Sequence, residues 1–146
     1  MPRLLAIATR PKKRAPMEEC VSAAVTFENG VGSDSRGKFR NHRQVTVLTK
    51  EGWDAACTEM GKELPWTTRR ANLFIVGIDL QGTTGKHLQI GRLKLEITGE
   101  LEPCNRMDEQ FQGLTNALKA DWRGGVTCRI VEEGQVKVSD PVQLLL

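Results

Sequence analysis

The stretch VTCRIVEEGQVKV, residues 126–138, decides the fold class. Val126, Cys128 and Ile130 alternate with the residues between them, so they share one face of a predicted strand. The pair Glu133-Gly134 then predicts a hairpin turn into a second strand. We therefore expect a β-rich domain in which Cys128 is packed as a structural thiol.

Similar short apolar runs, separated by turns that contain glycine, continue along the chain. They predict strands at residues 4–8, 21–27, 44–48, 71–76, 87–90, 93–98, 126–132, 135–138 and 142–146. The segments 51–61 and 108–122 instead have apolar residues at helical spacing, with Thr49 as the expected N-cap of the first. Cys57 lies on the apolar stripe of the first segment and is expected to fill the core. The predicted fold is mainly β with two helices, closed as a barrel.

Composition limits the possible functions. The chain has 146 residues, of which 39% are hydrophobic and 27% charged, so we expect a single domain over residues 1–146. A net charge of +3, three Trp, four Phe and no Tyr argue against base stacking, so no nucleic-acid partner is expected. No apolar run approaches the roughly 20 residues of a membrane span, and residues 1–10 are more typical of a strand than of a signal peptide. Four cysteines at scattered positions favour a reducing, cytoplasmic setting.

The stretch LEITGELEPCNRM, residues 95–107, carries the candidate reactive group. Cys104 follows a predicted strand and precedes a predicted helix that begins near Asp108. A thiol at a strand-to-helix turn can lie near the positive end of the helix, and Arg106 adds further positive charge; both favour the thiolate. Because a thiolate is both a nucleophile and a metal ligand, Cys104 is the candidate for either role.

Three segments that contain arginine flank the predicted strands: residues 30–43, 67–73 and 123–125. Glycine lets the backbone approach a ligand, and arginine supplies paired donors for phosphate or carboxylate. Such segments are typical of a site for a phosphorylated small molecule, but solvated basic loops have the same composition. Both interpretations stay open on residue chemistry alone.

The order of these pieces resembles the MOSC family, the module found at the C-terminus of molybdenum cofactor sulfurases and as a stand-alone protein. The resemblance covers roughly residues 15–146. It rests on Asp34 with its Gly-rich turn, residues 43–48, 69–73, 77–80, 90–91, 95–98, Pro103-Cys104, residues 123–126 and residues 139–142.

The resemblance implies roles for individual residues. Cys104 matches the family cysteine, which carries sulfur as a persulfide in sulfurase-like members. In the amidoxime-reductase branch the matching cysteine binds the molybdenum of the pterin cofactor. The cofactor-binding residues that the resemblance implies are Arg69, Arg70, Asn72, Arg123, Gly124 and Asp34.

Two functions are compatible with this one cysteine. In the first, the protein binds the molybdenum cofactor (molybdopterin) through Cys104 and reduces N-hydroxylated substrates. Its electrons would come from an external electron-transfer protein, because the chain has no iron–sulfur or flavin motif. In the second, a non-enzymatic sulfur carrier holds a persulfide on Cys104, loaded by a cysteine desulfurase, for delivery to a metal-sulfur cofactor. A bare binding module is a third interpretation, and no pyridoxal phosphate is expected in this chain.

Overall fold

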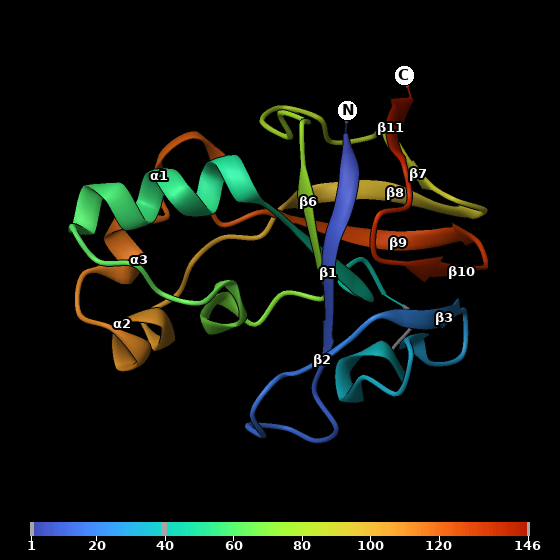
Figure 1. The fold of residues 1–146 in the computed structure, drawn as a ribbon, viewed down its shortest axis with the longest axis horizontal. Helices are drawn as coiled ribbons and strands as arrows, with labels where there is room; N and C mark the ends of the chain where they lie inside the picture. Colours follow the sequence, from blue (N-terminus) through green and yellow to red (C-terminus); the bar gives the residue numbers. More distant parts are fainter. Residues whose placement is uncertain (1, 39–40, 146) are drawn as a thin grey trace.

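The computed structural model describes residues 2–38 and 41–145, and strands dominate it (Figure 1). The strands are β1 (Arg3–Thr9), β2 (Glu18–Cys20), β3 (Ser22–Thr26), β4 (Gly30–Val31), β5 (Val45–Thr49), β6 (Leu73–Val76), β7 (His87–Ile90), β8 (Leu93–Glu100), β9 (Val126–Glu132), β10 (Gly134–Lys137) and β11 (Val142–Leu145). The helices are α1 (Lys50–Met60), α2 (Arg106–Gln110) and α3 (Leu114–Ala117), with 3-10 turns η1 (Ser35–Lys38), η2 (Trp66–Arg69) and η3 (Ala120–Trp122).

The strands form one large and one small sheet. The large sheet has eight strands in the order β11-β7-β8-β9-β5-β6-β1-β2, and the small sheet has three in the order β10-β3-β4. β5 and β6 run parallel, whereas β8 pairs antiparallel with both β7 and β9. Each strand that the apolar runs predict has a counterpart within a few residues.

The large sheet curls without closing. The chain just before β11 meets β1 at an isolated bridge between Arg3 and Pro141. The same edge of β1 pairs with β2 over Ile7–Thr9, which leaves only the first residues of β1 for that contact. Within the described residues no sheet closes on itself, so the predicted closed barrel is wrong, and the fold is mainly β with open sheets.

The predicted hairpin at Glu133-Gly134 is also wrong. β10 pairs with β3 in the small sheet, while β9 belongs to the large sheet. At the turn, a Cβ on Gly134 would lie 2.6 Å from the backbone nitrogen of Leu93, so glycine is needed for the chain to pass the start of β8. Pairing with a distant strand thus overrides the local turn signal.

The first predicted helix is confirmed and the second is not continuous. α1 begins at the predicted N-cap, where Thr49 Oγ1 accepts a hydrogen bond from Gly52 N at 3.0 Å. The second segment is broken into α2, α3 and η3: Gly113, between α2 and α3, has a φ of +95°, and Asp121, inside η3, has a φ of +52°. The described residues therefore contain three α-helices instead of two.

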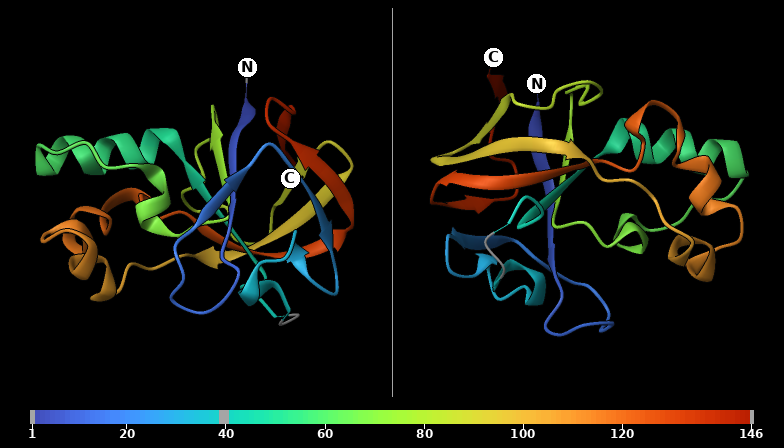
Figure 2. Two further views of the ribbon diagram at one scale, coloured as in Figure 1. Left: turned by 60° about the horizontal axis from the view of Figure 1, so that its bottom comes forward. Right: turned by 180° about the vertical axis from the view of Figure 1, so that it is seen from behind.

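The three α-helices pack together at one side of the sheets, and we call them the helical lobe (Figures 1 and 2). Cys57 lies in the apolar cluster of this lobe, and Cys128 lies in the cluster inside the sheets, so both pack as predicted. Among the described residues, no helix combines the length and the apolar character needed to cross a membrane.

Candidate functional site

Cys104 lies in the connection between β8 and α2, as the sequence predicted. It is the exposed cysteine of the four, whereas Cys20 is half-buried and both Cys57 and Cys128 are buried. Burial raises the pKa of Cys128 and of Cys20 above the ordinary value for a thiol, which favours their neutral forms. Exposure therefore separates Cys104 from the other three.

The backbone at Cys104 is anchored by α3. Its carbonyl oxygen accepts hydrogen bonds from Thr115 Oγ1 at 2.7 Å and from Met107 N at 2.9 Å. Thr115 N also donates to Asp108 Oδ1 at 2.9 Å, and these bonds from Thr115 lower the pKa of Asp108. No local pattern in the sequence predicts a role for Thr115, because its contacts form only where the chain turns back at Gly113.

Cys104 lines a hollow of about 430 Å³, which we call the thiol hollow. His42 and Arg43, from the chain that enters β5, contribute basic groups to its wall. Glu100 and Glu102, on the chain between β8 and Cys104, contribute carboxyl groups. The residues that line the hollow with Cys104 therefore include basic and acidic types.

A hydrogen bond ties the basic part of the wall to β8. Thr98 Oγ1 donates to the carbonyl oxygen of His42 at 2.6 Å.

Burial and the neighbouring Glu102 raise the pKa of Glu100, and Arg69 opposes this shift. Of the basic segment 30–43, residues 39–40 lie outside the described part of the chain.

Arg69 lies inside the protein behind the Cys104 segment, with 6% of its surface exposed. Its Nη2 donates to Leu101 O at 2.7 Å and its Nε to Gly124 O at 3.0 Å. Its Nη1 lies 3.6 Å from the sulfur of Met107. Arg69 and Gly124 are thus brought to the Cys104 segment through its backbone and its neighbours.

Arg70 and Asp34 lie together around Arg10, near the β1–β2 connection. Arg70 adopts a left-handed backbone with a φ of +67°, and its Nη2 donates to Ala15 O. Burial and the charge of Arg10 lower the pKa of Arg70, and Asp34 opposes them. Asp34 is buried, and its Oδ1 accepts from Arg10 N at 2.7 Å.

Asn72 lies in the interior between strands. Its Oδ1 accepts from Thr46 N at 3.1 Å, and its Nδ2 donates to Ala8 O at 3.2 Å. Both side-chain groups of this buried amide are therefore bonded to the backbone of β5 and β1, where they support the sheet.

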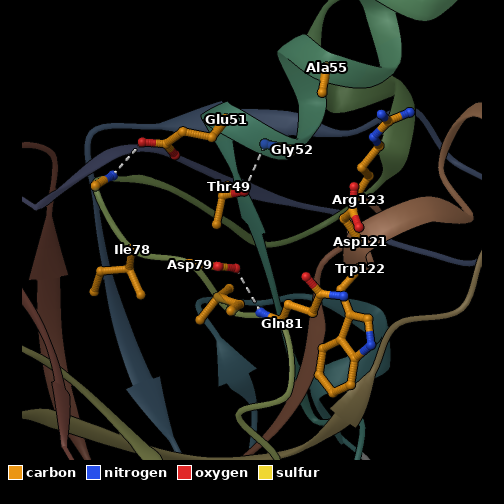
Figure 3. A pocket seen from close by; sticks show the side chains of 12 residues that line it. Thr49, Glu51, Gly52, Ala55, Ile78, Asp79, Gln81, Asp121, Trp122 and Arg123 are labelled. Atoms are coloured by element: carbon orange, nitrogen blue, oxygen red, sulfur yellow. Dashed lines mark hydrogen bonds between the residues drawn. The ribbon is translucent and has the colours of Figure 1, made fainter.

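Arg123 lines a second hollow, of about 560 Å³, which we call the indole hollow after Trp122 on its wall (Figure 3). The guanidinium bonds both α1 and α3: Nη1 donates to Glu59 Oε1 in α1 at 2.7 Å and to Ala117 O in α3 at 3.0 Å. Cys104 lines only the other of the two hollows.

The residues implied as cofactor-binding therefore occupy different places. Arg69 and Gly124 lie behind the Cys104 segment, and Arg70 and Asp34 lie around Arg10. Asn72 lies between β5 and β1, and Arg123 lies at the indole hollow. Their contact with a cofactor stays a prediction. His42 and Arg43 share the thiol hollow with Cys104, and the sequence marked them only as part of a basic segment.

A family model identifies the family of this chain, and solved structures support the fold. The model of the MOSC domain family matches residues 34–143, and no curated protein matches the sequence. The crystal structure of YuaD from Bacillus subtilis is similar with a TM-score of 0.83 and 17% identity, over 99% of this chain and 96% of that one. YiiM from Geobacillus stearothermophilus is similar with a TM-score of 0.79 and 14% identity, over 100% and 76%. YiiM from Escherichia coli has a TM-score of 0.73 and 14% identity, over 99% of this chain and 70% of that one.

At such identities the structures indicate the fold alone, whereas the family match covers most of the chain. The chain therefore belongs to the MOSC domain family, which is linked to the molybdenum cofactor.

Proposed function

We propose that this protein binds the molybdenum cofactor and that the Cys104 sulfur is a ligand of the metal. The observation that carries the proposal is the exposed thiol of Cys104 on the wall of a hollow of about 430 Å³. That volume lies within the range of small-molecule sites, roughly 300–1,000 Å³. Cys104 also lies within the segment that the MOSC family model matches.

The groups in the thiol hollow fit such a cofactor. A thiolate binds soft metals, and His42 and Arg43 are suited to its anionic part. Among residues 2–38 and 41–145, no cluster of three or more His, Cys, Asp or Glu side chains could hold a metal ion. A metal at Cys104 must therefore bring most of its own ligands, as the metal of an organic cofactor does.

The protein side of the reaction is binding and orientation. When bound, the cofactor would supply a redox-active metal that could reduce an N-hydroxylated substrate, with electrons from an external electron-transfer protein. Thr115 Oγ1 donates a hydrogen bond of 2.7 Å to the carbonyl oxygen of Cys104, which fixes the thiol relative to the helical lobe. Glu100 and Glu102 place carboxyl groups on the wall where a basic substrate nitrogen would be attracted.

The second candidate is a sulfur carrier, and the exposure of Cys104 favours it as well, because a donor protein could reach the sulfur. The thiolate would attack the outer sulfur of a persulfide on a cysteine desulfurase. A sulfur–sulfur bond would form on Cys104 while the donor's own sulfur–sulfur bond breaks, and the donor cysteine would leave as a thiolate. The two candidates differ in what stays on Cys104 after purification.

The test is the molybdenum content of protein from a host that makes the cofactor. We compare the wild type with Cys104→Ser and with Cys20→Ser, a matched control because Cys20 lies half-buried in β2. We expect nearly one metal per protein in the wild type and in the control, and almost none in Cys104→Ser. Equal metal in all three proteins would exclude Cys104 as a ligand. If all three lack metal, one added sulfur atom in the intact mass of wild type and control, absent in Cys104→Ser, would favour the carrier.

A further inference from the structure

Arg69 contacts the chain on both sides of Cys104. Its Nη2 donates to the carbonyl of Leu101, three residues before the thiol, at 2.7 Å. Its Nη1 lies 3.6 Å from the sulfur of Met107, three residues after the thiol. Its Nε donates to Gly124 O at 3.0 Å, so the same guanidinium joins this segment to the turn before β9.

We propose that Arg69 is a positioning residue for Cys104: its guanidinium holds residues 101–107 against the turn at Gly124 and so fixes the thiol at its hollow. The proposal rests on the proposed function only in treating Cys104 as the reacting group. It assigns Arg69 an action through the backbone, in place of contact with the anionic part of a cofactor.

The chemistry of arginine suits this position. A guanidinium is planar and donates in several fixed directions, so it can bond two carbonyl groups on separate segments at once. A lysine ammonium on a flexible stem keeps the charge but not this geometry. Because only 6% of Arg69 is exposed, its charge needs such partners to be tolerated inside the protein.

The turn at Gly124 is shaped around this contact. A Cβ at position 124 would lie 2.8 Å from Leu101 O and 3.0 Å from Arg69 Nη2. Leu101 N also donates to Gly125 O at 2.8 Å. Both backbone groups of Leu101 are therefore held, one by Arg69 and the other by the turn, just before the chain reaches Cys104.

Arg70 provides a matched comparison. It is the next residue, but its side chain bonds Ala15 O near Arg10, away from the Cys104 segment. A role that depends only on an arginine at this turn would give both residues similar effects. A positioning role for Arg69 predicts that only its replacement loosens the thiol.

The test is the mobility of a nitroxide spin label on Cys104, in metal-free Cys20→Ser protein, read from its electron paramagnetic resonance spectrum. The remaining cysteines, Cys57 and Cys128, are buried and should not react. We expect Arg69→Lys to narrow the spectrum and Arg70→Lys to leave it unchanged. Amide exchange over residues 101–107 should rise at least about tenfold in Arg69→Lys only, with β10 unaffected, since hydrogen bonds from a charged group are lost.

Two further measurements keep the proposal open to refutation. Guanidinium ion at millimolar concentration should restore the ordered spectrum of Arg69→Ala, because it can occupy the vacated place of the side chain. If these variants do not fold, the positioning role of Arg69 is tested in the wild type by nuclear magnetic resonance of the Arg69 Nε–H group. We expect slow solvent exchange of that hydrogen and no shift on addition of inorganic phosphate.

An unchanged spectrum and exchange rate in Arg69→Lys, or a phosphate-dependent shift of the Nε–H signal, would overturn the proposal. Neither result depends on molybdenum. Failure of the positioning role is therefore distinguishable from failure of the proposed function.

Discussion

The two hollows differ in the chemical groups on their walls. Arg123 lines the indole hollow, whereas Gly124, the next residue, bonds Arg69 behind the thiol hollow. The larger, at about 560 Å³, has Trp122 and Arg123 on its wall but no thiol, and Arg123 is paired with Glu59 outside the wall. The smaller, at about 430 Å³, has an exposed thiol on a segment bonded to Arg69 and Thr115. A reactive group on a segment held by hydrogen bonds is therefore a better criterion for the proposed site than the volume of a hollow.

The largest effect on stability is expected from Gly124→Ala. Its methyl group would lie 2.8 Å from Leu101 O, so the turn and the Cys104 segment must move apart. We expect a loss of about 1–3 kcal/mol in the free energy of unfolding, measured by urea denaturation.

Gly99→Ala is the matched control, because Gly99 also lines the thiol hollow and a Cβ there would meet no atom within 4 Å. Its effect should be much smaller. Equal losses in the two variants would contradict a close contact specific to Gly124.

Thr115→Val tests the hydrogen bond from Thr115 to the backbone of Cys104. The variant keeps the shape of a side chain that is 7% exposed but removes the hydroxyl that donates to Cys104 O. We expect a loss of about 1–2 kcal/mol in unfolding free energy, together with faster amide exchange at Cys104 and its neighbours. If the protein is destabilised but amide exchange at Cys104 and its neighbours is unchanged, Thr115 does not position the thiol.

Arg123→Gln should affect only the indole hollow. The Arg123–Glu59 pair has a 2.7 Å contact, but half of the Glu59 side chain is exposed, so its loss should cost about 0–1 kcal/mol. Glu59→Gln should have a similar effect, smaller at high salt. We expect wild-type molybdenum content in Arg123→Gln, because Arg123 does not line the thiol hollow. Metal loss in this variant would instead support the cofactor contact that the family resemblance implies for Arg123.

The smallest effect is a pH dependence at Asp108. Hydrogen bonds from Thr115 lower the pKa of Asp108 in the folded protein, so the charged carboxylate is favoured by folding. This stabilisation is fully present above the unfolded pKa, about 4, and is lost as the pH falls through the lower folded pKa. Asp108→Asn should therefore be slightly less stable than the wild type at pH 7, with the difference shrinking below about pH 4 in thermal denaturation. A constant difference would contradict this assignment.

Most of the strands and α1 could be predicted because their signals are local. Alternating or continuous apolar residues mark nine of the eleven strands in the described residues, and Thr49 marks the start of α1. The short strands β2 and β4 were not predicted, because neither contains an apolar run. The break in the second helix also had a local signal, Gly113, which takes a φ of +95°. The open sheet and the pairing of β10 with β3 could not be predicted, because they depend on contacts between segments far apart in sequence.

The residues of the candidate site likewise include some that local sequence patterns predict and some that they do not. The position of Cys104 between a strand and a helix is visible in the sequence, and the structure confirms it. Arg69 and Arg70 look equivalent there, yet the left-handed backbone at Arg70 sends the two side chains to different parts of the molecule. Thr115 reaches Cys104 only after α3 has packed, so no local pattern marks it.

X-ray absorption at the molybdenum edge tests the central claim most directly, because it counts the sulfur ligands of the metal. Because Cys104→Ser is expected to lose the metal on purification, both proteins are measured with the cofactor added back, and the sulfur count is taken per molybdenum atom. We predict one sulfur fewer around molybdenum in Cys104→Ser, with an oxygen ligand in its place. An identical sulfur count in the two proteins would contradict Cys104 as the ligand.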